Sequence, residues 1–381
     1  MTNNGYSPGL RGVVAAETQL SGVDGEAGEL IIRGYRVEEF ASKATFEETI
    51  QLMWHGHLPN QSELARFTAM LSAWRNLPKI TLDVLREAAS QKISPMDALR
   101  MAVGTLDLRS LSDPAHENED RNAVAIVGRM PTIVAAYWRL YNGQDPIASR
   151  AELSTAANYL YMLNGEEPNA DRVRALDTYL NTVVDHGLNA STFAARVIMA
   201  TGSDVISAVV GAIGALKGPL HGGAPGPALD MVFEIGDEAG AEPWLRKHLS
   251  NGELLMGFGH RIYKVRDPRA EVLAPAAEEL FKKAGDMRLY NLAQFVEEKA
   301  LQLIEEYKPG RSIKTNVEFF TALLLHGLEL PTDLFAPTFA ISRAVGWIAH
   351  CNEQKALGQI IRPSSVYVGP KGLKWKPAEI I

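Results

Sequence analysis

The sequence holds three short breaks between apolar segments, and each carries one titratable side chain, at His221, His260 and Glu318. The break around His260 offers the most chemistry. Two glycines bracket Phe258 just before the histidine, and four cationic side chains follow within residues 261–269. Glycine permits close ligand approach, so the pattern predicts a tight loop that holds an imidazole beside a basic cluster, suited to polarising or protonating an oxygen of an anionic ligand. The alternative is a solvent-exposed charged loop with an incidental histidine.

Two imidazoles and a carboxylate outside any metal-binding motif suit acid–base chemistry on a carbon acid. In such a reaction an imidazole donates a hydrogen bond to the developing enolate oxygen while the carboxylate removes the α-proton. The sequence lacks the motifs of P-loop NTPases, Rossmann dehydrogenases, zinc proteases and serine hydrolases. Taken singly, each of the three residues is more often structural than catalytic, and spacing alone does not bring them together.

Composition places the chain among ordinary globular proteins, since 46% of its 381 residues are hydrophobic and 22% are charged. A formal net charge of −7 argues against a nucleic-acid-binding or membrane-surface protein, because its field repels phosphate. No apolar run is long enough to span a bilayer, and the first residues lack the basic and apolar regions of a signal peptide. We therefore expect a cytoplasmic protein.

No metal site is predicted. The single cysteine, Cys351, excludes both an intramolecular disulfide and a cysteine-rich zinc site. His55 and His57 flank a glycine at a predicted helix end without a third ligand nearby, which favours a capping or packing role over metal binding.

Helical periodicity dominates from residue 45 onward, and only residues 10–36 have β character. Residues 12–18 are predicted as a short strand and residues 21–35 as a hairpin. The predicted helices cover residues 45–54, 62–77, 82–89, 95–106, 122–141 (kinked or divided at Pro131), 154–163, 172–184, 191–200, 205–216, 240–251, 270–284 and 291–307, with two more that begin near residues 316 and 338. Residues 220–227 interrupt the helical pattern.

Several motifs resemble those of the citrate synthase family, and the resemblance extends over essentially the whole chain. Residues 257–262 together with 267–269 resemble the family's long and specific signature. Residues 218–224 resemble its other histidine loop, and residues 12–34 are similar to the opening of bacterial and archaeal members. The resemblance implies an all-α homodimer with two domains that close over oxaloacetate and complete the acetyl-CoA site.

The predicted fold is accordingly a large helical domain with an inserted small helical domain and a short N-terminal β hairpin. The large domain is expected to comprise residues 1–221 and 323–381 and to carry the dimer contacts and the oxaloacetate site. The small domain is expected to comprise residues 222–322 and to carry the acetyl-CoA site.

By this resemblance the catalytic residues are His221, His260 and Glu318. His260 would hydrogen-bond and protonate the oxaloacetate carbonyl, His221 would stabilise the enol of acetyl-CoA, and Glu318 would remove the methyl proton. The residues that would bind oxaloacetate are His186, Arg269, Arg343 and Arg362, the last donated by the partner subunit. Guanidinium groups pair bidentately with carboxylates, so arginine suits these positions.

The coenzyme A site implied by the resemblance comprises Leu255, Met256, Gly257, Gly259, Lys264, Lys314 and Asn316. Acetyl-CoA is a co-substrate in this family, and the resemblance implies neither a permanently bound cofactor nor a metal. Residues 1–9 leave no room for the N-terminal regulatory domain of some members, so no allosteric site is expected there.

One departure from the family pattern concerns Glu318, because most members have aspartate at that position. The two acids have similar pKa values, but the extra methylene moves the carboxylate, and misplacement of about 1 Å can cost about a hundredfold in rate. Three functions stay open: a citrate synthase, a 2-methylcitrate synthase that uses propionyl-CoA, and a non-catalytic protein that binds CoA or a dicarboxylate.

Overall fold

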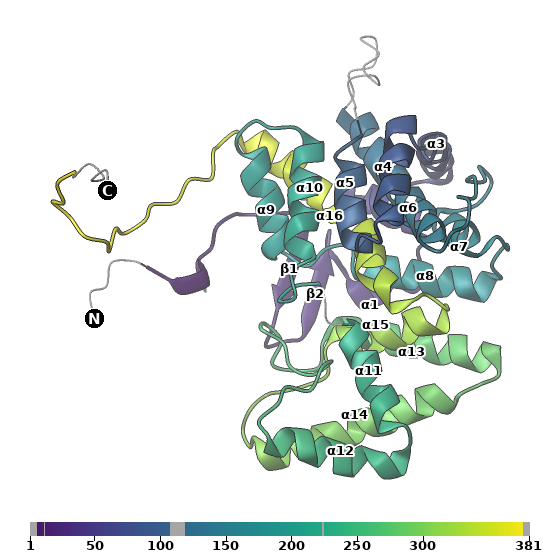
Figure 1. Ribbon diagram of the computed structural model, residues 1–381, viewed down its shortest axis with the longest axis vertical. Helices are drawn as coiled ribbons and strands as arrows, with labels where there is room; N and C mark the ends of the chain where they lie inside the picture. The colour runs from purple at the N-terminus through teal and green to yellow at the C-terminus, as the bar shows by residue number, and fades with distance from the viewer. Residues whose placement is uncertain (1–5, 11, 107–118, 223–224, 376–381) are drawn as a thin grey trace, which may run out of the picture.

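The computed structural model describes residues 6–10, 12–106, 119–222 and 225–375. This part of the chain is mainly helical, with one small antiparallel sheet close to the N-terminus (Figure 1). The predicted all-α class with a short N-terminal hairpin is confirmed. None of the helices in the described ranges is both long and apolar enough to cross a membrane.

The sheet consists of the antiparallel strands β1 (Ser21–Asp24), β2 (Glu29–Ile32) and β3 (Tyr35–Arg36). Asp24 closes the turn between β1 and β2, because its carboxylate accepts the N–H groups of Glu26 and Ala27, both at 2.9 Å. Leu30 and Ile32 point to the same face of β2 and are fully buried. The sheet is therefore anchored in the core by one face, and its turn projects from it.

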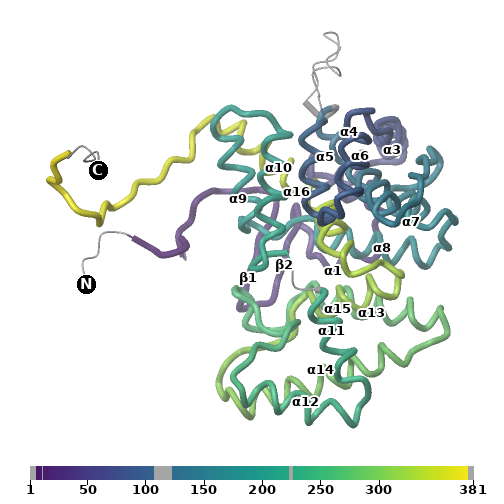
Figure 2. The backbone as a smooth tube through the Cα atoms, viewed as in Figure 1, coloured from purple at the N-terminus to yellow at the C-terminus, as the bar shows by residue number. Residues whose placement is uncertain are grey.

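The strand predicted at residues 12–18 is wrong. These residues form no regular structure, and Val14 is 87% exposed. A strand needs a neighbouring strand for its hydrogen bonds, and this segment instead leaves the body of the protein on the same side as the segment that follows residue 357 (Figures 1 and 2).

Two long helices, α6 (Glu119–Tyr141) and α16 (Phe335–Leu357), run through the body. Every residue of α16 between 340 and 351 is buried, as expected for a helix in a protein interior. Pro131 does not divide α6, contrary to one of the two predicted outcomes. The adjacent Met130 and Ile133 are fully buried, so packing outweighs the hydrogen bond that proline cannot make.

The other helices of the body surround this pair. They are α1 (Val37–Phe40), α2 (Phe46–His55), α3 (Gln61–Ala73), α4 (Lys79–Ser90), α5 (Pro95–Val103), α7 (Thr155–Asn164), α8 (Ala170–Thr182), α9 (Ala190–Met199) and α10 (Val205–Leu216). Most of these helices, though not α1 and α4, start after a polar residue that caps them. Thr45 and Asn60, for example, each form a capping box with the glutamate three residues further on.

A second group of helices lies at the lower end of the molecule in Figure 1. It comprises α11 (Pro225–Ile235), α12 (Glu238–Ser250), α13 (Pro268–Ala284), α14 (Arg288–Tyr307) and α15 (Val317–Gly327). Helix α12 packs on α14, and α13 packs on both α15 and α8 of the body. The predicted division into domains at residues 222 and 322 stays a prediction, and its second boundary falls within α15.

Helix α11 was not expected, because residues 220–227 were predicted to be irregular and no helix was predicted between residues 216 and 240. The helix begins at Pro225 and includes Pro227. The first N–H groups of a helix have no partner within it, so prolines in the first turn remove no hydrogen bond and favour the helical φ angle. The two prolines thus mark a helix start.

Candidate active site

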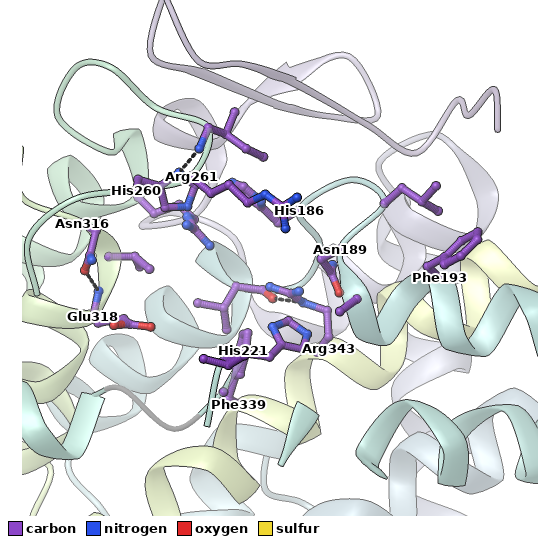
Figure 3. Close-up of a pocket in the computed structure, with 18 of the residues that line it drawn as sticks. His186, Asn189, Phe193, His221, His260, Arg261, Asn316, Glu318, Phe339 and Arg343 are labelled. Carbon is purple, nitrogen blue, oxygen red and sulfur yellow. Dashed lines mark hydrogen bonds between the residues drawn. The ribbon is translucent and has the colours of Figure 1, made fainter. Parts of the chain in front are cut away.

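A cavity of about 930 Å³ opens where α8, α9, α13, α15 and α16 meet the two histidine loops. Six side chains predicted from different parts of the sequence line it, namely His186, His221, His260, Arg269, Glu318 and Arg343. Figure 3 shows the Glu318 carboxylate directed into the cavity from one side and His221 beside Arg343 facing it, with His186 and His260 above them. The structure therefore brings these six side chains together, which the spacing in the sequence did not establish.

The loop that carries His260 depends on two glycines with left-handed backbone angles, Gly257 (φ +85°) and Gly259 (φ +86°). A Cβ atom at Gly257 would lie 2.9 Å from the ring of Phe319, so the position also requires the absence of a side chain. The N–H of Gly259 donates to the carbonyl of Lys314 at 2.7 Å. This bond holds the loop against the segment that leads into α15.

His260 is held as a neutral hydrogen-bond donor. Its Nδ1 accepts the backbone N–H groups of Ile262 (3.1 Å) and Tyr263 (3.0 Å), so the ring proton lies on Nε2. Burial and the charge of Arg269 lower the pKa of His260 to about 4. At neutral pH the ring can therefore donate from Nε2 to a ligand oxygen, as an imidazole that stabilises a developing oxyanion must.

His186 lies next to His260, with the two rings edge to face and their centroids 5.6 Å apart. Its Nε2 is 3.1 Å from the hydroxyl of Tyr263, whose ring stacks on His260. Burial, together with the charges of Arg269 and Arg343, lowers the pKa of His186 well below its ordinary value. Both imidazoles are therefore uncharged in a positive environment that attracts anions.

His221 contacts the start of α9 through Ser191. The backbone N–H of Ser191 donates to Nε2 at 3.3 Å, and its hydroxyl oxygen lies 2.8 Å from the same nitrogen. Trp347 donates its indole N–H to that hydroxyl at 3.0 Å. With Nε2 an acceptor, the ring proton is on Nδ1. Burial and the charge of Arg343 lower the pKa of His221 to about 4, so this ring is also a neutral donor.

Arg269 and Arg343 supply the positive charge of the cavity, and both are buried. Arg269 forms a bidentate pair with Asp267, at 3.0 Å from Nε and 2.8 Å from a terminal nitrogen. Arg343 donates from Nε to the carbonyl of Val183 at 2.8 Å and lies over the ring of Phe339. In the described part of the chain Arg343 forms no ion pair. Burial lowers the pKa of Arg343 to about 10.

Glu318 lies in the first turn of α15, where its N–H donates to the side chain of the capping residue Asn316 at 3.0 Å. Burial raises the pKa of the Glu318 carboxyl to about 7, against the opposing charge of Arg269. A carboxyl with a pKa near neutrality can accept a proton from carbon and release it again, which suits a general base. The longer side chain does reach the cavity, since Glu318 is one of its lining residues.

The structure does not bring every predicted site residue to this cavity. Arg362 is exposed in the segment that leaves the body after α16. Of the predicted coenzyme A residues, Gly259 and Asn316 line the cavity, and the Asn316 amide donates to the Gly259 carbonyl at 2.9 Å. The others are not lining residues; Lys264 and Lys314 are exposed, whereas Leu255, Met256 and Gly257 are at least partly buried.

Sequence reasoning missed several residues of the site. Tyr179, Asn189 and Phe339 line the cavity, and Tyr263 contacts two of its histidines. Tyr179 and Phe339 sit in ordinary helices, where no local pattern separates a cavity side chain from a core one. Asn189 carried a readable signal, because it is the N-cap of α9, but that signal indicates a helix start and no ligand.

Comparison with known proteins agrees with the predicted fold and family. A family profile described as "Citrate synthase, C-terminal domain" matches residues 9–364. A citrate synthase from Haloferax volcanii is 43% identical, over 97% of this chain and 98% of the relative. A 2-methylcitrate synthase from Mycobacterium tuberculosis is 38% identical, over 95% of this chain and 90% of the relative.

Among solved structures, a ternary complex of citrate synthase from Thermoplasma acidophilum with carboxymethyl coenzyme A and oxaloacetate superposes with a TM-score of 0.88. The two chains are 31% identical, and the match covers 98% of each. These matches share the fold of the chain over nearly its whole length. The chain belongs to the citrate synthase family.

Proposed function

We propose that the protein is a citrate synthase, which condenses acetyl-CoA with oxaloacetate and water to give citrate and CoA. One observation carries the proposal: two imidazoles that are neutral donors and a carboxyl with a pKa near 7 face one cavity that two buried arginines make positive. This set can enolise a thioester and polarise a carbonyl, which are the two activations that the condensation needs.

In the proposed reaction Glu318 takes a proton from the methyl group of acetyl-CoA. The Nδ1–H of His221 donates a hydrogen bond to the thioester oxygen and stabilises the enol. The enol carbon then attacks the carbonyl carbon of oxaloacetate, whose oxygen receives a proton from Nε2 of His260. Water hydrolyses the thioester of the resulting citryl-CoA and releases citrate and CoA. No step requires a metal, and acetyl-CoA is a co-substrate rather than a bound cofactor.

Oxaloacetate would bind through His186, Arg269 and Arg343, which all line the cavity and of which both arginines act electrostatically on His186. A third arginine, Arg362, is proposed to come from the partner subunit of a homodimer. Its own segment leaves the body and exposes Val368 and Trp375, at 92% and 89%, as an arm that embraces a second copy would. The active site would then be complete only in the dimer.

Coenzyme A is proposed to bind at the rim formed by residues 255–259 and 314–316, with Lys264 and Lys314 as exposed partners for its phosphates. Only Gly259 and Asn316 of this set line the cavity. The remaining residues would reach coenzyme A when residues 222–322 move as a small domain and close over oxaloacetate. The related structure with both ligands is that of another protein and supports the proposal by similarity.

The second candidate is 2-methylcitrate synthase, which the 38% identical Mycobacterium tuberculosis relative favours. The two reactions use the same groups and differ by one methyl on the acyl chain. Such a difference is worth only about 1–3 kcal/mol in a pocket, so both acyl-CoA substrates can turn over.

The test is oxaloacetate-dependent release of CoA, followed with a thiol reagent, for acetyl-CoA and propionyl-CoA in parallel. The wild type is compared with Glu318→Asp and Glu318→Gln. A higher kcat/KM with acetyl-CoA that disappears in the Gln variant supports citrate synthase, whereas a preference for propionyl-CoA supports the second candidate. If neither substrate turns over although oxaloacetate binds, both candidates fail and a non-catalytic binding protein is left.

A further inference from the structure

The β1–β2 hairpin contacts both the loop that carries His186 and the loop that carries His260, although none of its residues lines the cavity. At one end is Ser21, the first residue of β1. Its hydroxyl donates to the buried carboxylate of Asp185 at 2.5 Å and accepts the N–H of Gly187 at 2.9 Å. One side chain thus contacts both neighbours of His186, the carboxylate of Asp185 and the backbone of Gly187. Ser21 is partly exposed and Asp185 is fully buried.

The Asp185 carboxylate is held from a second direction by α16. His350, which is also fully buried, places its Nε2 3.2 Å from the same carboxylate oxygen that Ser21 contacts. Gly346 lets α16 come close, since a Cβ atom there would lie 2.5 Å from the Val184 carbonyl. The Asp185 carboxylate, next to His186, is therefore held between the hairpin and α16.

At its other end the hairpin reaches the His260 loop. The carbonyl of Gly25, in the β1–β2 turn, accepts the N–H of Lys264 at 2.9 Å. A Cβ atom at Gly25 would lie 2.3 Å from the carbonyl oxygen of Ile262, so the turn and the loop are in direct backbone contact. Residues 262 and 263 are the ones whose N–H groups fix the Nδ1 of His260.

We propose that the β1–β2 hairpin sets the spacing of the two imidazoles, with Ser21 as a positioning residue for His186 and Gly25 as a positioning residue for His260. This inference rests on the proposed roles of the two histidines. It gives the N-terminal sheet a function in catalysis although none of the hairpin residues lines the cavity. The two ends act on different steps, because His186 is proposed to bind oxaloacetate and His260 to protonate it.

The test uses Ser21→Ala and Gly25→Ala with matched controls. Ser21→Ala removes the hydrogen bonds to Asp185 and Gly187 and is expected to raise KM for oxaloacetate about tenfold, while KM for the acyl-CoA stays unchanged. Ser21→Thr keeps the hydroxyl and should restore KM. Gly25→Ala displaces the His260 loop and is expected to lower kcat by about tenfold or more.

The controls are Gly22→Ala, whose new Cβ would meet no atom within 4 Å, and Ser72→Ala, which removes a surface hydroxyl bonded to Ala151. Both should leave kcat and KM as in the wild type. A merely structural hairpin would instead lower the melting temperature in Ser21→Ala and Gly25→Ala and leave kcat and both KM values of the folded fraction unchanged, and that result would overturn the proposal.

A second measurement needs no substrate. Hydrogen–deuterium exchange of a peptide that covers residues 184–189 should speed up in Ser21→Ala, because the Gly187 N–H loses its acceptor. Unchanged exchange there would also overturn the proposal. Calorimetric titration of the wild type and Ser21→Ala with oxaloacetate distinguishes failure of the proposed function from failure of the hairpin proposal. Absence of binding to the wild type contradicts the proposed function. Binding that Ser21→Ala does not weaken contradicts only the role of the hairpin.

Discussion

Two regions of the cavity wall carry one buried arginine each, and the surroundings shift the pKa values of the two arginines in opposite directions. At the start of α13, Arg269 forms a bidentate pair with Asp267, and although burial alone would lower its pKa, the carboxylate holds the pKa of Arg269 above its ordinary value. In the middle of α16, Arg343 contacts a backbone carbonyl and an aromatic face, and burial lowers its pKa to about 10 against the opposing charge of Asp185, with which it forms no ion pair.

The difference indicates two purposes for the same residue type. A buried pair satisfies both charges and ties together the elements that carry them. Asp267 also caps α13 and accepts the N–H of Val317 at the start of α15, so the Arg269 pair is part of the joint between two helices. A buried guanidinium without a carboxylate at ion-pair distance has N–H donors left to bind an anion, so an anionic ligand is the natural partner for it.

Replacement of Arg269 should produce the largest effect. Arg269→Met leaves Asp267 as an unpaired carboxylate in the interior, so the free energy of unfolding is expected to fall by about 3–5 kcal/mol. Activity should be lost as well, because the proposed oxaloacetate site loses a cation. Chemical denaturation monitored by circular dichroism measures the first effect, and the CoA-release assay measures the second.

The double variant Arg269→Met/Asp267→Asn is the control for this prediction. It removes both charges, so most of the lost stability should return while activity stays absent. A single variant that is as stable as the wild type would show that the Asp267 pair does not hold the joint.

Replacement of Arg343 should affect activity without lowering stability. Arg343→Met removes a charge whose burial is unfavourable in the free protein, and the loss of one hydrogen bond to Val183 costs only about 1 kcal/mol. The melting temperature is therefore expected to stay the same or rise, while kcat/KM for oxaloacetate falls by about a hundred- to a thousandfold. Thermal unfolding and steady-state kinetics on one preparation test both parts.

Arg343→Lys is the matched variant, because it keeps the charge and removes the planar fork. It should recover part of the affinity for oxaloacetate but not all of it. A large drop in melting temperature in Arg343→Met would contradict the comparison, since it would mean that Arg343 stabilises the free protein as Arg269 does.

The contrast between the arginines also shows how far the sequence could be read. The pairing of Arg269 was within reach, because Asp267 stands two residues before it at a helix start. The isolation of Arg343 was not, because it depends on which side chains α8 and the His186 loop place around α16. The loops of His221, His260 and Glu318 could be picked out because glycine or a capping residue adjoins each titratable side chain.

Errors in the fold have equally local causes. The start of α11 was missed because prolines that interrupt a helix in its interior initiate one at its first turn. Residues 12–18 have strand composition and no neighbouring strand. The hairpin could be predicted from its turn chemistry, but its contacts with Asp185 and Lys264 could not, since they join segments more than 150 residues apart in sequence.

The smallest expected effect is the pH dependence of the reaction, and it tests the same comparison. Burial raises the pKa of Glu318 to about 7, while His221 and His260, with pKa values of about 4, stay neutral above pH 5.5. If ionised Glu318 is the base, kcat/KM should rise about tenfold per unit below pH 7 and level off above it. The residual activity of Glu318→Gln should lack this ascending limb.

The same group makes a prediction about stability with a definite sign. The folded pKa of Glu318 lies above its ordinary value of 4.5, so between pH 4.5 and 7 the folded protein holds a proton that the unfolded chain releases. The contribution of Glu318 to stability is therefore complete below pH 4.5 and is lost as the pH rises through 7. Denaturation midpoints of wild type and Glu318→Gln should diverge across this window.

Arg343→Met then relates the pH profile back to the two arginines. Arg269 is the cation that acts most strongly on Glu318, and it opposes the effect of burial on the pKa of that carboxyl. The weak residual activity of Arg343→Met should accordingly keep its ascending limb near pH 7, even though oxaloacetate binding is impaired. A limb that moves to higher pH in this variant would mean that Arg343 shares the electrostatic task of Arg269, and the division between a structural and a ligand-binding arginine would no longer hold.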